Sequence, residues 1–189
     1  MSPPDLSLKV AKDLPSLRRS ELFAVIRACL VRGKERFGFR VVQFSVQGTH
    51  IHLLCEAKDR EALSRGLKGL CVRFARRLNR RLGRKGQVFP DRYHARILRT
   101  PTEVHRVLRY LLLNTRRHEA EKGRELHHRY LDPCSSAYHF TAWLGLIATP
   151  APGRAPPVAE ARTWLVRKGW MKVEGPISPE FVPGRKRGC

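Results

Sequence analysis

The sequence predicts an α+β fold of the ferredoxin-like (RRM-like) class: a βαββαβ antiparallel sheet with an added helix and a C-terminal extension. Two observations lead to this prediction. Short segments alternate apolar and polar residues while longer ones repeat apolar residues every three or four positions, and the two kinds follow one another in the order β-α-β-β-α-β. We therefore expect two helices on one face of the sheet, with the added helix free to approach the other.

The first four elements follow from periodicity and one short turn. Residues 6–11 alternate apolar and polar side chains, which is typical of a half-buried strand. Residues 17–36 repeat apolar side chains at helical spacing. Residues 39–47 and 51–57 are rich in Val, Ile, Phe and Leu, and a Gly-Thr pair separates their cores. These two segments predict an antiparallel hairpin, because so short a connection joins adjacent antiparallel strands.

Capping residues delimit the later elements. Asp59 is suited to the N-cap of a long helix, and Gly83 is suited to end it. Short strand segments are expected at residues 88–89 and 95–98. Residues 100–103, Thr-Pro-Thr-Glu, combine a Thr N-cap, Pro at the first helical position and Glu at the third. This capping box predicts the start of the added helix.

The chain of 189 residues is too short for two full domains, so we expect one domain with a peripheral extension. The predicted domain covers residues 1–147 and ends in a short amphipathic segment at residues 138–147. Residues 148–189 are expected to be a Pro-rich linker and a basic tail that carries Trp164 and Trp170.

The charge points to a polyanion as partner. Lys and Arg number 38 against 16 Asp and Glu, for a formal net charge of +22, yet 42% of residues are hydrophobic, so a folded domain carries the charge. Arg supplies 28 of the 38 basic residues, which favours phosphate contact. No apolar run long enough for a membrane span and no signal peptide are found. Five scattered cysteines without a C-x-x-C pair argue against a disulfide framework and fit a cytoplasmic protein.

A histidine pair in the second strand of the hairpin is the first candidate for chemistry. His50 and His52 stand two positions apart, so both side chains point to one face of the sheet, opposite Ile51. Two imidazoles side by side can bind one divalent cation. The pattern alone is weak, since two half-exposed surface histidines would look the same. The sequence lacks the further ligands of a zinc hydrolase, because no Asp-His follows the pair and no H-E-x-x-H motif occurs.

The added helix supplies two polar side chains that strengthen the metal hypothesis. Tyr110 and Asn114 lie one turn apart on the flank of its apolar stripe. Both can face the sheet from there. Asn114 could add an oxygen ligand, and Tyr110 could reach a phosphate bound to the cation.

With these residues in place, the sequence resembles the REP-associated tyrosine transposases, within the HUH single-tyrosine transposases of insertion sequences. The resemblance covers roughly residues 6–146. It depends on the element order and on the motifs V-Q-G-T-H-I-H-L-L, V-F-P-D-R-Y-H-A-R-I-L and R-Y-L-L-L-N. One departure is the Gly-Thr pair before the first histidine, where the family often has Asn.

The resemblance implies a metal-dependent transposase that nicks and rejoins hairpin-containing single-stranded DNA through a 5′-phosphotyrosine. It assigns His50, His52 and Asn114 to the metal and Tyr110 to the nucleophile. Mg²⁺ or Mn²⁺ is the expected cofactor, with Mn²⁺ better suited to imidazole. A cytoplasmic, nucleoid-associated bacterial protein is expected, as a monomer or homodimer. Whether Tyr110 serves its own site or a partner's stays open.

Basic residues on three elements are the candidates for DNA contact. The second long helix has a run of arginines with no acidic residue after Glu61, whereas a solvated face normally mixes charges. The candidates are Arg73, Arg76, Arg77, Arg80, Arg84, Arg92, Tyr93, Arg106 and Arg117. Tyr93 is the rival nucleophile, ahead of Tyr130 and Tyr138, but it has no carboxamide one helical turn away. Base stacking fits it better.

Two other functions account for part of the sequence. A catalytically idle, domesticated DNA- or RNA-binding regulator would use the same fold, but an RRM places aromatic residues on its exposed strands. The strand at residues 39–47 instead offers Gln43, Ser45 and Gln47 on one face. A phosphodiesterase with paired H-x-T motifs would need a second histidine pair, which the sequence lacks.

Overall fold

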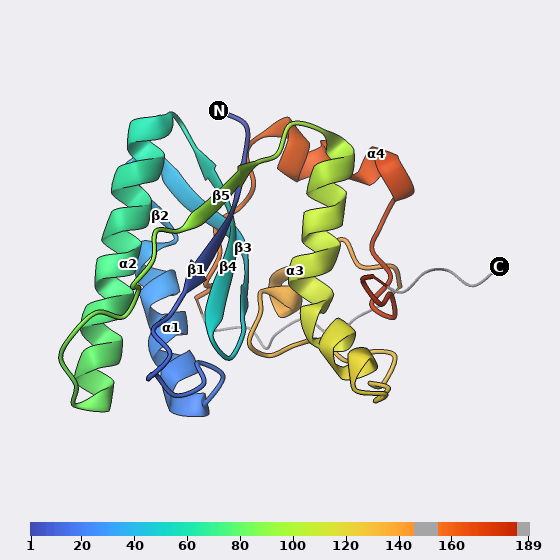
Figure 1. Cartoon of the computed structure of the whole chain (residues 1–189). Coiled ribbons are helices and arrows are strands. Elements are labelled where there is room, and N and C mark those ends of the chain that lie inside the picture. Colours follow the sequence, from blue (N-terminus) through green and yellow to red (C-terminus); the bar gives the residue numbers. More distant parts are fainter. Residues whose placement is uncertain (146–154, 185–189) are drawn as a thin grey trace.

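A single antiparallel sheet organises the molecule, with helices on both faces (Figure 1). The structure is a computed structural model that describes residues 1–145 and 155–184. The elements are β1 Pro4–Lys9, α1 Ser20–Gly33, β2 Glu35–Arg36, β3 Phe39–Val46, β4 His50–Ala57, α2 Arg60–Leu82, β5 His94–Ile97, α3 Pro101–Glu121 and α4 Met171–Glu174, with a 3-10 turn at Ala137–His139 and a π-helical turn at Leu165–Gly169. The strand order β2-β3-β4-β1-β5 confirms the α+β, ferredoxin-like prediction, to which the two-residue β2 is an addition.

The β3–β4 hairpin forms the centre of the sheet as predicted. Ser45 pairs with His52, and the backbone N–H of Gln47 donates to the carbonyl of His50 across the turn at 2.9 Å. On its other side β4 pairs with β1, where Ser7 is opposite His52. His52 therefore lies on an interior strand with both neighbours in place, which fixes its direction.

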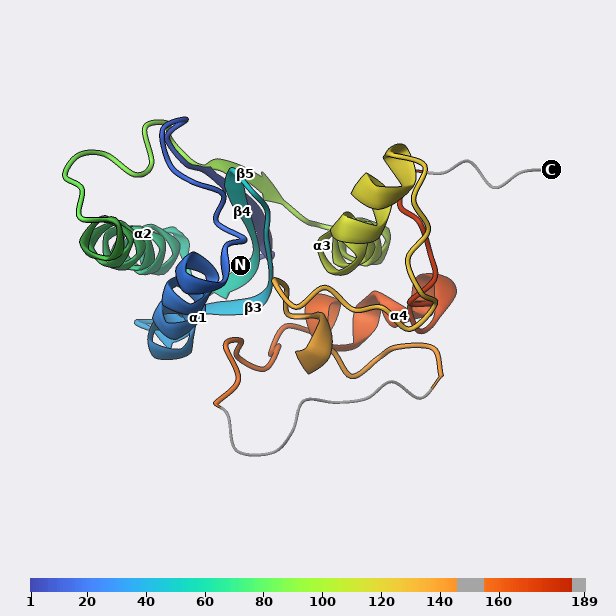
Figure 2. The same ribbon diagram turned by 90° about the horizontal axis from the view of Figure 1, so that it is seen from below.

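Two apolar clusters pack on the sheet, one with α1 and α2 and the other with α3. Figure 2 shows these helices on opposite faces of the sheet. On β4, Ile51, Leu53 and Cys55 face the layer beneath α1 and α2, as expected. Leu54 faces the second layer, beneath α3, together with Leu108. The added helix therefore covers the face that carries the two histidines.

The predicted capping residues are found at both ends of α2 and at the start of α3. The Asp59 carboxylate accepts from the backbone N–H of Ala62 at 2.7 Å, and Gly83 ends α2 in the left-handed region with φ 61°. Thr100 and Glu103 form the predicted capping box at the start of α3. Side chains thus satisfy backbone donors that would otherwise lack partners.

Three elements differ from the predictions by more than one residue. β1 begins at Pro4 because its pairing with β5 extends the sheet to that residue. α1 covers only Ser20–Gly33, since the chain then turns into β2. The structure has no strand at the predicted residues 88–89. Val88 is buried there, and its carbonyl accepts a hydrogen bond of 2.9 Å from the N–H of Ala11, just beyond β1.

The C-terminal extension packs on the α3 side of the molecule. Buried Glu56 accepts from the backbone N–H groups of Arg162 and Thr163, both at 2.8 Å, and from the Thr163 hydroxyl at 2.6 Å. Trp170 is buried and stacks on His105. Within residues 138–145 the amphipathic segment forms the end of a 3-10 turn and a parallel β-bridge from Trp143 to Ile177. The predicted domain boundary at 147/148 lies outside the described residues. No helix of the described ranges is long and apolar enough to cross a membrane.

Candidate active site between strand β4 and helix α3

The structure brings the histidine pair and the tyrosine into contact. The His50 and His52 rings lie on one face of β4 with their centroids 4.6 Å apart. The Tyr110 ring meets His52 edge to face, with a centroid distance of 5.3 Å. Tyr110 reaches this position because α3 packs its apolar stripe on the sheet and presents the flank of the helix to β4. His50, His52 and Tyr110 therefore form one cluster, as their spacing in the sequence predicts.

Asn114, one turn beyond Tyr110, is a buried amide without a partner. Its side chain is 0% exposed, and neither Oδ1 nor Nδ2 has a hydrogen bond. The Nε2 atom of His52 is likewise buried and unpaired. Leaving a buried polar group unsatisfied costs about 1–3 kcal/mol, so such groups call for an explanation. A cation bound through the lone pairs of Asn114 Oδ1 and His52 Nε2 would supply one for these two atoms.

The donor set fits a divalent cation. Two imidazole nitrogens and a carboxamide oxygen suit Mn²⁺ and also accommodate Mg²⁺, and three protein ligands leave positions for a phosphate. Within residues 1–145 and 155–184, no group of three or more His, Cys, Asp and Glu side chains could hold a metal ion. A cation site here would consequently depend on Asn114.

Burial keeps both histidines in the form that binds metal. It lowers the pKa of His50, and it lowers the pKa of His52 to about 4, with the neighbouring His50 as a further cause. Both imidazoles are thus neutral at pH 7, with Nε2 of His52 unpaired and Nδ1 of His50 3.2 Å from the Thr49 hydroxyl.

His118 is a member of this neighbourhood that the sequence analysis did not single out. Its charge contributes to lowering the pKa of both His50 and His52. It stands one turn beyond Asn114 and pairs with Glu121, with 3.1 Å between Nδ1 and the carboxylate. The four-residue spacing of Tyr110, Asn114 and His118 places them on one side of the helix, and this pattern could have indicated His118 from the sequence.

A partly buried ion pair links α3 to the hairpin. Arg18 donates two hydrogen bonds of 2.8 Å to Asp132 and a third, of 2.9 Å, to the carbonyl of Val46. The hydroxyl of Thr115 donates to the same carboxylate at 2.6 Å. Asp132 thus links the residue next to Asn114 with the turn that precedes His50. None of these contacts was predicted from the sequence.

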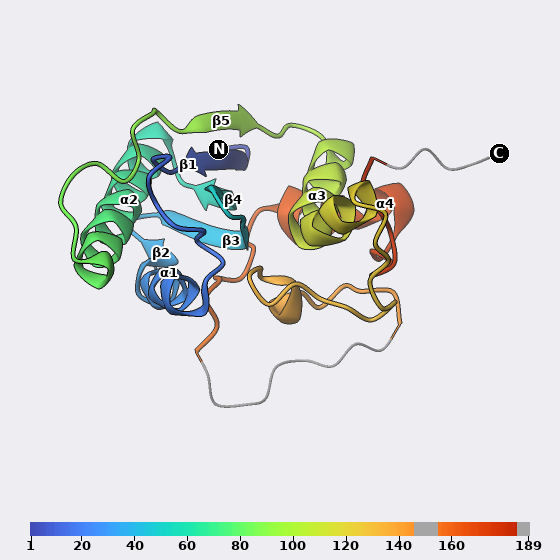
Figure 3. The same ribbon diagram turned by 60° about the horizontal axis from the view of Figure 1, so that its bottom comes forward.

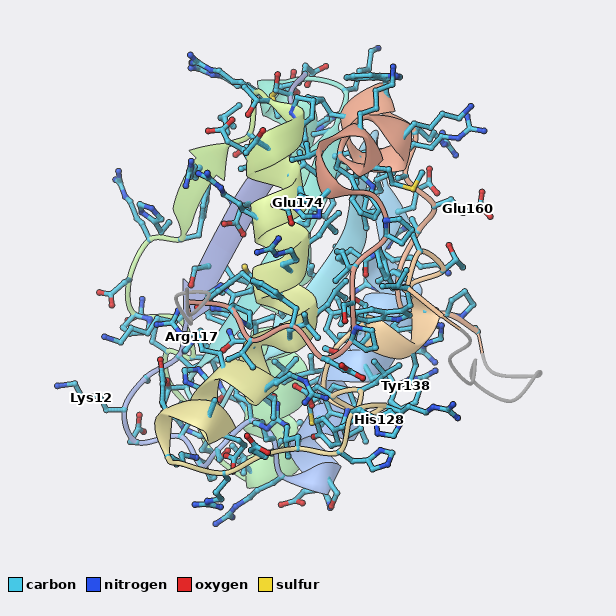
Figure 4. The ribbon with its side chains drawn as sticks, turned by 90° about the vertical axis from the view of Figure 1, so that its right-hand side faces the viewer. Lys12, Arg117, His128, Tyr138, Glu160 and Glu174 are labelled. Atoms are coloured by element: carbon cyan, nitrogen blue, oxygen red, sulfur yellow. The ribbon has the colours of Figure 1, made fainter. Side chains whose placement is uncertain are left out.

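A cavity of about 370 Å³ opens beside Tyr110, and cationic side chains outnumber the acidic Asp5 and Glu103 in its lining. Arg96, Arg106 and Arg117 line it, and the guanidinium of Arg117 lies 6.0 Å from the centre of the Tyr110 ring. Figure 4 looks onto α3 with the sheet behind it and shows Arg117 beside the helix. Arg117 also pairs with Glu121 at 2.8 Å, so its charge is partly balanced. Phe181 also lines the cavity.

The arginines of α2 are not brought to this site. α2 packs on the sheet face opposite α3 (Figure 2), so the basic surface made by Arg73, Arg76, Arg77 and Arg80 lies on the far side from Tyr110. Within the described part of the chain none of these four is in an ion pair, while Arg84 pairs with Asp13 at 2.7 Å. The remaining candidates, Arg92 and Tyr93, immediately precede β5 at the sheet edge and are exposed.

The polar face of β3 is not an open platform. Gln43, Ser45 and Gln47 are all buried. Ser136 donates to the Gln43 side chain, and Ser135 bridges to Ser45. The segment after α3 therefore covers the strand that an RRM would use for RNA.

Comparison with known proteins gives the fold. The structure is similar to a REP-associated tyrosine transposase bound to a REP hairpin, with a TM-score of 0.55 and 12% identity over 81% of this chain and 91% of that chain. A candidate transposase from Deinococcus radiodurans aligns with a TM-score of 0.44 and 16% identity, over 66% and 92% of the two chains. No family model and no curated protein matches the sequence. The chain has the fold of the REP-associated tyrosine transposase.

Proposed function

We propose that the protein is a metal-dependent transposase that nicks and rejoins hairpin-containing single-stranded DNA through a phosphotyrosine at Tyr110. One observation carries the proposal: Tyr110 contacts His52, while the amide of Asn114, one turn along α3, is buried without a partner. Metal-assisted phosphoryl transfer requires a nucleophile and groups that can bind a cation, and Tyr110, the two neutral histidines and the Asn114 amide supply these.

His50, His52 and Asn114 would hold Mg²⁺ or Mn²⁺. When bound, the cation would supply charge neutralisation and polarisation of the scissile phosphate. The shared fold with a hairpin-bound transposase supports DNA as the substrate class. The net charge of +22 supports the same conclusion.

The chain's own residues account for the remaining steps. Arg96 and Arg106 line the cavity beside Tyr110 and can position the phosphates that flank the scissile bond. The Tyr110 oxygen attacks phosphorus, and the bond from phosphorus to the 3′ oxygen breaks. The phenolic proton is lost to solvent, and the leaving 3′ oxygen takes up a proton. The product is a 5′-phosphotyrosine with a free 3′-hydroxyl, which retains the phosphoester bond needed for rejoining.

A covalent-adduct assay tests this proposal. Wild-type protein, Mn²⁺ and an end-labelled hairpin with single-stranded flanks should give a protein–DNA adduct that survives denaturation, whereas Tyr110→Phe should give none and still bind the DNA. Tyr138→Phe is the matched control, because Tyr138 is exposed on the 3-10 turn after α3. Tight binding without an adduct by wild type in Mg²⁺ and Mn²⁺ would favour the idle regulator instead.

A further inference from the structure

A second cavity, of about 790 Å³, lies on the other side of the edge strand β5. It is bounded by Tyr93 and Ile97 from the β5 segment and by Arg60 and Ser64 from the first turns of α2, with Arg99 at its end. We call it the Tyr93 pocket. The active-site chemistry described above does not use it.

The Tyr93 pocket exists because α2 does not cover the edge of the sheet. α2 packs over β3 and β4, two and more strands away from β5, and Figure 3 shows β5 at the margin of the sheet. The four residues of β5 are all exposed. An exposed edge strand with uncovered apolar side chains is a feature that proteins normally avoid, unless it serves to bind something.

Alternate residues of β5 serve the two cavities. Arg96 points to the α3 side, where it lines the cavity beside Tyr110 and pairs with Glu103 at 2.9 Å. Ala95 and Ile97 line the Tyr93 pocket on the opposite side, as the period of two in a strand requires. The two cavities are therefore separated by the width of one strand, whose outer edge no other strand of the described residues covers.

The chemistry of the Tyr93 pocket suits a nucleobase and its phosphates. Tyr93 is 42% exposed and Ile97 is 38% exposed, which gives an aromatic and apolar surface for stacking. Within the described ranges the guanidinium groups of Arg60 and Arg99 are in no ion pair, so both are free for phosphate. Glu61, the acidic residue of the lining, is itself paired with Arg65 at 3.5 Å.

We propose that the Tyr93 pocket binds an unpaired base of the DNA strand whose phosphate lies at Tyr110, and that this strand crosses the free edge of β5. This inference depends on the proposed function for the identity of the strand. A strand that crosses this edge would extend from the Tyr110 cavity toward the face of the sheet that α2 covers.

Binding in EDTA tests the pocket independently of any catalysis. Fluorescence anisotropy would compare a hairpin that has single-stranded flanks with the same hairpin without them. Loss of stacking on one base corresponds to about 1–3 kcal/mol, so Tyr93→Ala should weaken binding of the flanked hairpin by about 5- to 150-fold. Tyr93→Phe should restore it. Tyr138→Ala, at a residue 38% exposed elsewhere on the surface, is the control and should bind as wild type does.

A position scan identifies the base. 2-Aminopurine placed at successive flank positions should lose fluorescence at one position with wild type and with Tyr93→Phe, but not with Tyr93→Ala. Equal affinities of wild type and Tyr93→Ala for the flanked hairpin would overturn the inference. An equal loss of affinity for the hairpin without flanks would also overturn it. The same holds if Tyr93→Ala abolishes self-association while DNA binding is unchanged. Failure of the covalent adduct with an intact Tyr93 effect would refute nicking and leave the pocket standing.

Discussion

Replacing Asn114 by Leu should stabilise the metal-free protein while removing its response to metal. Both polar atoms of the Asn114 amide are buried without partners, and Leu111 and Leu113 are buried nearby on the same helix. Leu is of similar size, so the change removes the penalty of an unsatisfied polar group, about 1–3 kcal/mol. For a protein of this length each kcal/mol raises Tm by about 2–4 °C.

Thermal unfolding in EDTA and in Mn²⁺ measures both effects. Wild type should gain stability with Mn²⁺, by about 2.7 kcal/mol at a metal concentration 100 times Kd. Asn114→Leu should have a higher Tm than wild type in EDTA, and Mn²⁺ should raise its Tm by less. Asn114→Asp should behave in the opposite sense, since a buried carboxylate is costly without metal and is a better ligand with it. An Asn114→Leu protein that is less stable than wild type in EDTA yet keeps the full Mn²⁺ shift would refute this reasoning.

Three further predictions concern the surroundings of the site. Burial lowers the pKa of His52 to about 4, so between pH 6.5 and 4 the unfolded chain takes up a proton that the folded chain does not. The free energy of unfolding in EDTA should therefore fall as the pH drops from about 6.5 toward 4. A slope of Tm against pH that is unchanged in His52→Gln would contradict this prediction. Asp132→Ala should lower the free energy of unfolding in urea by about 2–3 kcal/mol, because it removes the carboxylate that accepts two hydrogen bonds from the partly buried Arg18. Thr115→Val should lower it by about 1 kcal/mol, and equal losses from the two variants would count against the ion pair as the link between α3 and the hairpin. Glu56→Ala should expose the C-terminal extension to trypsin before the sheet unfolds, and cleavage unchanged from wild type would show that other contacts hold it.

Local signals in the sequence were sufficient for most of the fold. Asp59 and Thr100 each satisfy backbone donors within three residues, so the start of both long helices is decided by neighbouring atoms. The hairpin is similarly local, because a short turn joins strands of matching apolar pattern. The juxtaposition of His52 with Tyr110 then follows from one added assumption, that α3 covers the free face of the sheet.

Contacts between distant segments were beyond the reach of periodicity. Asp132 joins Arg18 across more than a hundred residues, and Glu56 holds Thr163 over a similar separation. The pattern of α2 showed which of its faces is polar, but not that this face points away from Tyr110. That depends on which side of the sheet the crossover places the helix. The buried, unpaired state of the Asn114 amide is equally a product of tertiary packing.

Peptide mapping of the covalent adduct tests the central claim most directly. Wild-type protein would be incubated with Mn²⁺ and a flanked hairpin, digested with nuclease and protease, and analysed by mass spectrometry for a peptide that carries a nucleotide. We predict that the nucleotide is attached to Tyr110 through its 5′ phosphate. Attachment to Tyr93, Tyr130 or Tyr138 would contradict the assignment of the site between β4 and α3.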